Sequence, residues 1–115
     1  MPTSEQAFKR GDVVVVPFPY SDKLAEKRRP ALVVSSDKFN RKGGFLWVVM
    51  ITSKLQKSQA DDIALDHTKA GLSKPSVVRV AKIATIEAAR VIRVAGRAEK
   101  SVSVSVQNQI KAIAG

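Results

Sequence analysis

Two stretches of this chain indicate its fold: GDVVVVPF at residues 11–18 and RRPALVVS at residues 28–35. Each starts with polar or basic residues and continues into a run of apolar, mostly β-branched residues, which is typical of a buried β-strand. We expect the first strand at Val13–Val16, ended by the prolines that follow it, and the second at Ala31–Ser35. A polar, basic loop connects the two strands and places Arg29, followed by a rigid proline, at the mouth of the second strand.

The rest of the chain continues with strand-sized apolar runs separated by turn residues. DKFN at residues 37–40 is a possible helical turn. Further strands are expected at Phe45–Thr52, Asp62–Leu65, Ser76–Ile83 and Val91–Gly96. We expect Phe45 and Trp47 to pack in the core, and Met50 and Ile51 to lie in the core or in a dimer interface.

The carboxy-terminal tail has two interpretations. Ser101–Val106 alternates like a strand, but one helical face collects the residues spaced four, four and three apart, namely Val102, Val106, Ile110 and Ile113. We favour a helix, because this face continues beyond Gln107, where the alternation fails. Several short strands and one terminal helix predict a mainly β fold, a small antiparallel barrel or half-barrel capped by the helix, in one domain over residues 1–115.

The chain is strongly basic. Its 115 residues include 20 lysines and arginines and 10 aspartates and glutamates, which gives a formal net charge of +10. Seven of the basic residues and three of the acidic ones fall between residues 21 and 42, so we expect a polyanionic partner, either nucleic acid or an acidic protein. The chain has no cysteine and no stretch typical of a signal peptide or membrane span, so we expect a cytoplasmic protein.

Six pieces of the sequence carry a resemblance to a known family. They are GDVVVVPF, RRPALVVS, the FN of DKFNR, VMITSK, GLSKPSVVRVAKIATI and VIRVAGR, and they extend from Gly11 to about Gly96. In this order and spacing they resemble the MazF/PemK toxins of type II toxin–antitoxin systems, which include Kid. The resemblance implies an SH3-like barrel of the CcdB/PemK type that forms a homodimer. It also implies a metal-independent endoribonuclease that needs no cofactor, cuts single-stranded RNA, inhibits translation and growth, and binds an acidic antitoxin.

The resemblance further implies which residues are catalytic. The Arg before Pro at the head of the second strand corresponds to Arg29, and the Thr that closes the third strand corresponds to Thr52. Some members also use the Arg of the VVR strand, here Arg79. The chain departs from the family pattern at Ala81, where Kid-like members carry an acid, and at Ala84, where many relatives carry Arg. These departures leave the proton donor open.

These residue types suit cleavage by the 2′-hydroxyl of RNA, which attacks the adjacent phosphorus. The guanidinium of Arg29 can bind two phosphate oxygens and stabilise their developing charge, and Thr52 can donate a hydrogen bond to them. The substrate strand is expected to contact the neighbouring basic and polar residues Lys23, Lys27, Arg28, Ser53 and Lys54. Glu26 is also expected among the RNA-contacting residues, and it is the candidate general base in the loop. Each of these residues has a structural alternative, such as an ion pair between Arg29 and a loop carboxylate.

Two other functions fit the same fold. CcdB toxins share the barrel but poison gyrase, and such a binder does not need the pair of Arg29 and Thr52. A catalytically inactive module that binds RNA or an antitoxin is the other alternative, suggested by Ala81 and Ala84. The single histidine, His67, lies in a polar loop, and we expect it at the surface rather than in catalysis. One histidine and no cysteine leave only scattered carboxylates, so no metal site is predicted.

Overall fold

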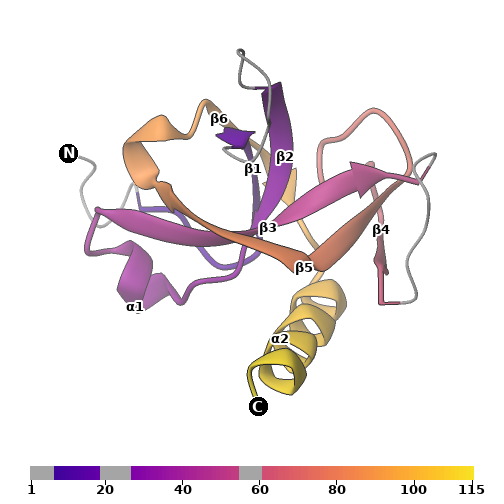
Figure 1. The fold of residues 1–115 in the computed structure, drawn as a ribbon. Coiled ribbons are helices and arrows are strands. Elements are labelled where there is room, and N and C mark those ends of the chain that lie inside the picture. The colour runs from indigo at the N-terminus through magenta and orange to yellow at the C-terminus, as the bar shows by residue number, and fades with distance from the viewer. Residues whose placement is uncertain (1–6, 19–26, 55–60) are drawn as a thin grey trace.

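The structure is a computed structural model that describes residues 7–18, 27–54 and 61–115. The strands are β1 (Asp12–Phe18), β2 (Lys27–Val33), β3 (Phe45–Ser53), β4 (Ile63–Leu65), β5 (Ser76–Glu87) and β6 (Arg93–Arg97) (Figure 1). The helices are α1 (Asp37–Asn40), the short 3₁₀ helix η2 (Ala88–Arg90) and α2 (Lys100–Ala114). Of the described helices, none has the length and apolar character needed to cross a membrane.

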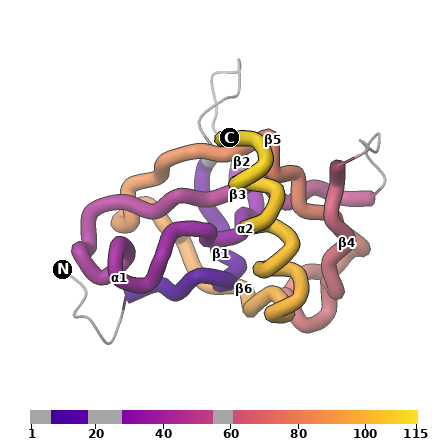
Figure 2. The backbone as a smooth tube through the Cα atoms, turned by 90° about the horizontal axis from the view of Figure 1, so that it is seen from below, coloured from indigo at the N-terminus to yellow at the C-terminus, as the bar shows by residue number. Residues whose placement is uncertain are grey.

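The strands form one antiparallel sheet in the order β4-β5-β3-β2-β1-β6. The sheet curls into a half-barrel, and α2 lies below it in Figure 1 and across it in Figure 2. The register between β3 and β5 shifts at one point: Val49 pairs with Ile83, but the next residue of β3, Met50, pairs with Arg79. Such an irregularity increases the local bend of a strand, so β5 can pair with β3 over both halves of the curled sheet. The mainly β fold with a carboxy-terminal helix is thus confirmed.

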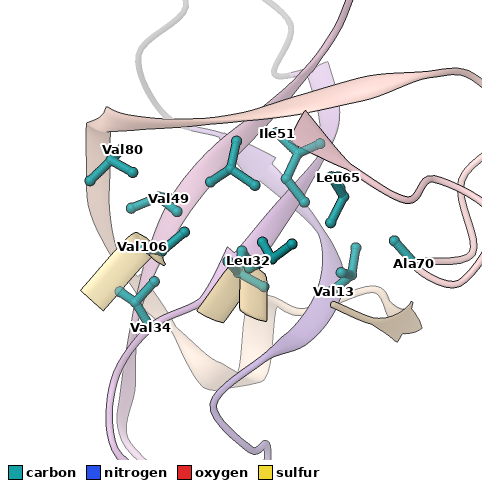
Figure 3. Packing of buried hydrophobic residues seen from close by; sticks show 11 residues of the cluster. Val13, Leu32, Val34, Val49, Ile51, Leu65, Ala70, Val80 and Val106 are labelled. Atoms are coloured by element: carbon teal, nitrogen blue, oxygen red, sulfur yellow. The ribbon is translucent and has the colours of Figure 1, made fainter. Parts of the chain in front are cut away.

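The core has two layers, one on each side of the sheet. Val13 belongs to the layer that α2 covers, shown in Figure 3, whereas its neighbour Val14 belongs to the layer on the opposite side. Because successive side chains of a strand point to opposite faces, a strand buried on both faces needs an unbroken apolar run. This explains why residues 13–16 and 31–34 are continuously apolar rather than alternating.

The helical interpretation of the tail is confirmed by α2. Val102 and Val106 are 7% and 0% exposed and pack in the same layer as Val13. Ile110, one turn further, is partly buried against that layer. Full burial of a valine side chain contributes about 1.5–3 kcal/mol, so this face of the helix, and not helix propensity, holds α2 in place.

The predicted end of the first strand was wrong. Strand β1 continues through Pro17, whose Cα partner is Arg28, and β2 already begins at Lys27. Proline lacks an N–H donor and is tolerated where a strand has an open side. Here β1 pairs with β6 only as far as Val15, so the tips of β1 and β2 form a two-stranded ribbon.

The predicted core packing of Phe45 and Trp47 was also wrong, since these side chains are 51% and 50% exposed. They alternate with buried Leu46 and Val48. Alternate residues of a strand share a face, so Phe45 and Trp47 lie on the same face of β3 as Val49 and Ile51. The core layer that contains α2 covers Val49 and Ile51 but does not extend over Phe45 and Trp47. For Met50 and Ile51 the core prediction is confirmed.

Candidate active site

An open groove of about 420 Å³ lies where β2 and β3 separate. The pairing of the two strands ends at Ala31 opposite Met50, and beyond it the strand ends point apart (Figure 1). If the antiparallel register of β2 and β3 continued past this pair, Arg29 would lie opposite Thr52. Both residues line the groove, so the fold brings together the two residues that the sequence analysis placed at its centre.

The groove is cationic. Arg28 and Arg29 enter it from β2, Arg93 from β6 and Lys74 from the loop before β5. Arg93 reaches the groove because it is the Cα partner of Val15, which also lines it. None of the groove-lining residues in the described part of the chain is acidic. A site with this lining attracts an oxyanion, which arginine can bind through two parallel N–H groups.

Hydroxyl groups line the same groove. Thr52 is 7% exposed, and Ser53, Ser73 and Ser76 join it in the lining. The Ser76 hydroxyl donates a hydrogen bond of 2.8 Å to the main-chain oxygen of Lys74, which ties the end of the loop to the beginning of β5. Hydroxyls are donors that need no metal or titration to contact a phosphate oxygen.

The loop that supplies Ser73 and Lys74 is held by a close contact of main chains. Gly71 has a φ of 76°, and a Cβ built on it would lie 1.9 Å from the main-chain oxygen of Ala95 in β6. The Leu72 N–H donates a 2.8 Å hydrogen bond to the His67 carbonyl. Only glycine allows both this conformation and this approach, so the loop that forms one wall of the groove depends on Gly71.

Arg79 occupies a different environment. Its Nε and Nη2 atoms donate to the two carboxylate oxygens of Asp62 at 3.0 and 2.8 Å, and the side chains of the pair are only 12% and 7% exposed. Arg79 does not line the groove. The structure therefore brings Arg29 and Thr52 together and engages Arg79 in a nearly buried ion pair that joins it to the residue just before β4.

The predicted RNA-contacting residues fall into three groups. Arg28 and Ser53 line the groove. Lys54 follows β3 and is exposed, with its N–H bonded to the Pro75 oxygen at 2.9 Å, but it is outside the lining. Lys23 and Glu26 lie outside the described residues. Lys27 is described only by its main chain, as the first residue of β2.

The sequence analysis did not single out Arg93 or Lys74. Both lie within pieces that carried the family resemblance, VIRVAGR and GLSKPSVVRVAKIATI, which was the available signal. His67 lies in the loop before β5 and is half-buried. Within residues 7–18, 27–54 and 61–115, no three His, Cys, Asp or Glu side chains are grouped so that they could hold a metal ion.

Comparison with known proteins gives a consistent result. A model of the PemK-like, MazF-like toxins of type II toxin–antitoxin systems matches residues 9–114. Among solved structures, MazE–MazF from Deinococcus radiodurans is 22% identical with a TM-score of 0.73, over 95% of this chain and 96% of that chain. An endoribonuclease in complex with its cognate antitoxin from a mycobacterial species is 17% identical with a TM-score of 0.75, again over 95% and 96% of the two chains.

A third structure, the Mycobacterium tuberculosis toxin MazF-mt6, is 20% identical with a TM-score of 0.71, over 88% of this chain and 93% of that chain. At these identities the structural similarity establishes a shared fold. No curated protein is significantly similar to the chain in sequence.

Proposed function

Because the chain belongs to the PemK-like, MazF-like toxin family of type II toxin–antitoxin systems, we propose that it is an endoribonuclease that cuts single-stranded RNA without a metal ion. Cleavage of messenger RNA would inhibit translation and growth. The observation that carries this proposal is the presence of Arg29 and Thr52 in one open, cationic groove that has no acidic residue in its described lining.

The groove supplies what a ribose-assisted cleavage needs. The nucleophile is the substrate's own 2′-hydroxyl, so the protein must orient the phosphodiester and stabilise the charge that grows on its oxygens. Arg29 performs the second task through its guanidinium, and the Thr52 hydroxyl donates to the same oxygens. Arg28, Lys74 and Arg93 hold the flanking phosphates. DNA lacks the nucleophile and is left intact.

The character of the groove favours RNA over a protein target such as gyrase. Its charged and hydroxyl-bearing residues outnumber its apolar ones, and no aromatic side chain belongs to the described lining. Protein–protein interfaces rely instead on buried aromatic and apolar anchors. A binder of gyrase would also gain nothing from a threonine placed beside an arginine at the point where two strands separate.

We further propose that the protein is one domain over residues 1–115 and acts in the cytoplasm as a homodimer. We also propose that an acidic antitoxin binds it. Two similar structures, one named MazE–MazF and the other an endoribonuclease with its cognate antitoxin, support the antitoxin. The net charge of +10 favours an acidic partner. For Arg79 we propose a stabilising role through Asp62, which leaves Arg29 and Thr52 as the catalytic pair.

The proposal is tested by incubating the purified protein with a mixed-sequence single-stranded RNA in the presence of a chelator. We expect cleavage, and Arg29→Ala should reduce its rate roughly 10²–10³-fold if the guanidinium stabilises the transition state. Arg41→Ala is the matched control, because Arg41 is exposed next to α1 and outside the groove. Intact RNA after long incubation with the wild-type protein, or equal rates for wild type and Arg29→Ala, would refute the proposed function.

A further inference from the structure

A second basic surface lies between the residues before β1, the end of β6 and α2. This surface, which we call the helix cleft, has a volume of about 630 Å³ and is lined by the cationic residues Arg10, Arg97, Lys100 and Lys111. It shares no residue with the groove of Arg29 and Thr52. No carboxylate belongs to its lining within the described parts of the chain. Asp12 offsets the charge of Arg97, and the three other cations around one concave surface raise the local concentration of anions.

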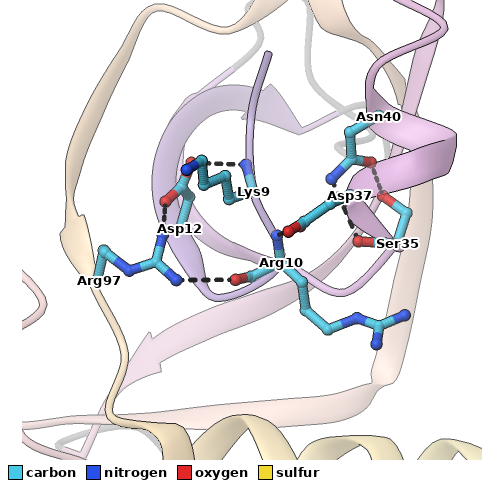
Figure 4. A network of polar contacts seen from close by, with 7 residues as sticks. All are labelled: Lys9, Arg10, Asp12, Ser35, Asp37, Asn40 and Arg97. Atoms are coloured by element: carbon cyan, nitrogen blue, oxygen red, sulfur yellow. Dashed lines mark hydrogen bonds and ion pairs between the residues drawn. The ribbon is translucent and has the colours of Figure 1, made fainter. Parts of the chain in front are cut away.

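The two arginines of the helix cleft are held in place by the fold (Figure 4). Arg97 donates from Nη1 to Asp12 Oδ1 at 2.5 Å and from Nη2 to the Arg10 main-chain oxygen at 3.1 Å. Its side chain nevertheless remains 55% exposed, whereas that of Asp12 is 12% exposed. Arg10 donates from Nε to the Val34 oxygen at 3.0 Å. Because both guanidinium planes are fixed beforehand, they lose little conformational freedom when they bind an anion.

Helix α2 forms the opposite wall with one continuous face. Lys100, Val104, Asn108 and Lys111 recur at spacings of four, four and three, and all line the cleft. This face is about 16 Å long at 1.5 Å per residue. Gln107 donates to the Val34 oxygen at 3.0 Å, the same oxygen that holds Arg10. The two walls are therefore fixed relative to each other.

Strand β6 links the helix cleft to the groove. Arg93 lines the groove and Arg97 lines the cleft, and four residues of strand separate their Cα atoms by at most about 13 Å. Neighbouring phosphates of a stacked strand are about 3.4 Å apart along its axis, so a few nucleotides cover this distance. Four cationic residues line the cleft, and no aromatic side chain belongs to its described lining, which favours a phosphate backbone over an acidic peptide with aromatic anchors.

We propose that the helix cleft is a second phosphate-binding subsite, which binds the backbone of single-stranded RNA beyond the segment in the groove. The proposal rests on the proposed function for the identity of the nucleic acid and extends it. Long substrates contact both sites, whereas a short oligonucleotide that fills the groove does not reach the cleft. The cleft therefore increases affinity for long RNA without taking part in the chemistry.

The test is a binding experiment with labelled 2′-O-methyl oligonucleotides, which lack the nucleophile and stay intact. One probe is short enough for the groove alone and the other is long enough for both sites. In the variant K100Q/K111Q, the affinity for the long probe should fall about tenfold or more at low salt. The slope of log K against log salt should fall in magnitude by roughly 1.4, since each single-strand phosphate contact contributes about 0.7. The short probe should bind as it does to the wild type.

The charge-matched control is K38Q/R41Q, which removes two exposed cations near α1 that line neither site. It should leave the binding of both probes within about twofold. Unchanged binding of the long probe by K100Q/K111Q, or equal losses for both probes, would overturn the subsite. If K100Q/K111Q loses affinity for the long probe alone, but the wild-type protein leaves ordinary RNA intact, the ribonuclease is refuted and the subsite is retained. If the wild-type protein cleaves RNA but K100Q/K111Q binds the long probe as tightly as the wild type does, the ribonuclease is retained and the subsite is refuted.

Discussion

Arg29 and Arg79 come from the same family pattern but lie in opposite environments. Arg29 is half-buried at the edge of an open groove whose described lining has no carboxylate. Arg79 is held by both oxygens of Asp62 in a pair that is almost buried. An arginine that is nearly buried and has its charge matched is a structural element, and one that faces an open cationic groove is available to a phosphate. The comparison teaches that burial together with a carboxylate partner, and not the arginine itself, decides between the two roles.

The largest expected effect concerns the Arg79–Asp62 pair. Replacing Asp62 with Ala leaves the buried guanidinium without this partner and should lower the free energy of unfolding by about 3–5 kcal/mol. Urea denaturation followed by circular dichroism measures this. The double variant Arg79→Met/Asp62→Leu is the control, because apolar side chains of similar size should restore much of the stability. A single variant as stable as the wild type would show that the pair is not structural.

The second largest effect concerns the hydroxyl of Thr52, which lines the groove with Arg29. Thr52→Val keeps the shape of the side chain and removes the hydroxyl, and we expect the rate of RNA cleavage to fall roughly 10–100-fold, the worth of a hydrogen bond to a charged group. Thr52→Ser keeps the hydroxyl and is the control, which should retain most of the rate. Steady-state cleavage of a fluorescent oligonucleotide distinguishes them. If Thr52→Ser loses as much as Thr52→Val, packing rather than hydrogen bonding explains Thr52.

The smallest expected effect is that of an Arg29 substitution on stability, which can be compared with the effect of breaking the Arg79–Asp62 pair. Arg29→Gln should change the free energy of unfolding by no more than about 0.5 kcal/mol, because Arg29 is half-buried and no carboxylate belongs to the described lining of its groove. The same denaturation experiment measures it. A loss comparable with that of Asp62→Ala would place Arg29 in a structural ion pair and contradict its availability to a phosphate.

Much of the fold followed from local patterns. The strands that contain Val14, Leu32 and Val49 were predictable because a strand buried on both faces needs an unbroken apolar run. The helix of the tail followed from the spacing of Val102 and Val106. Strand ends were less predictable, since whether β1 could continue past Val16 depended on where its other neighbour, β6, stopped pairing.

The candidate site was predictable only in part. Arg29 and Thr52 were found through the family resemblance, but no local pattern could show that Arg79 would meet Asp62, 17 residues away in sequence. Arg93 and Lys74 reach the groove from a separate strand and loop, so their place depends on the curl of the sheet. Trp47 shows the same limit, because its exposure was decided by how far α2 covers the face of β3.

By itself the sequence determined the periodic order of strands and helix, the excess of positive charge and the absence of cysteine. These depend on neighbours along the chain and on composition. The tertiary structure decided which arginines pair with a carboxylate and which line an open groove, because that depends on distances between residues far apart in sequence. It also decided where β2 and β3 separate, and therefore where the chain leaves an open cationic groove.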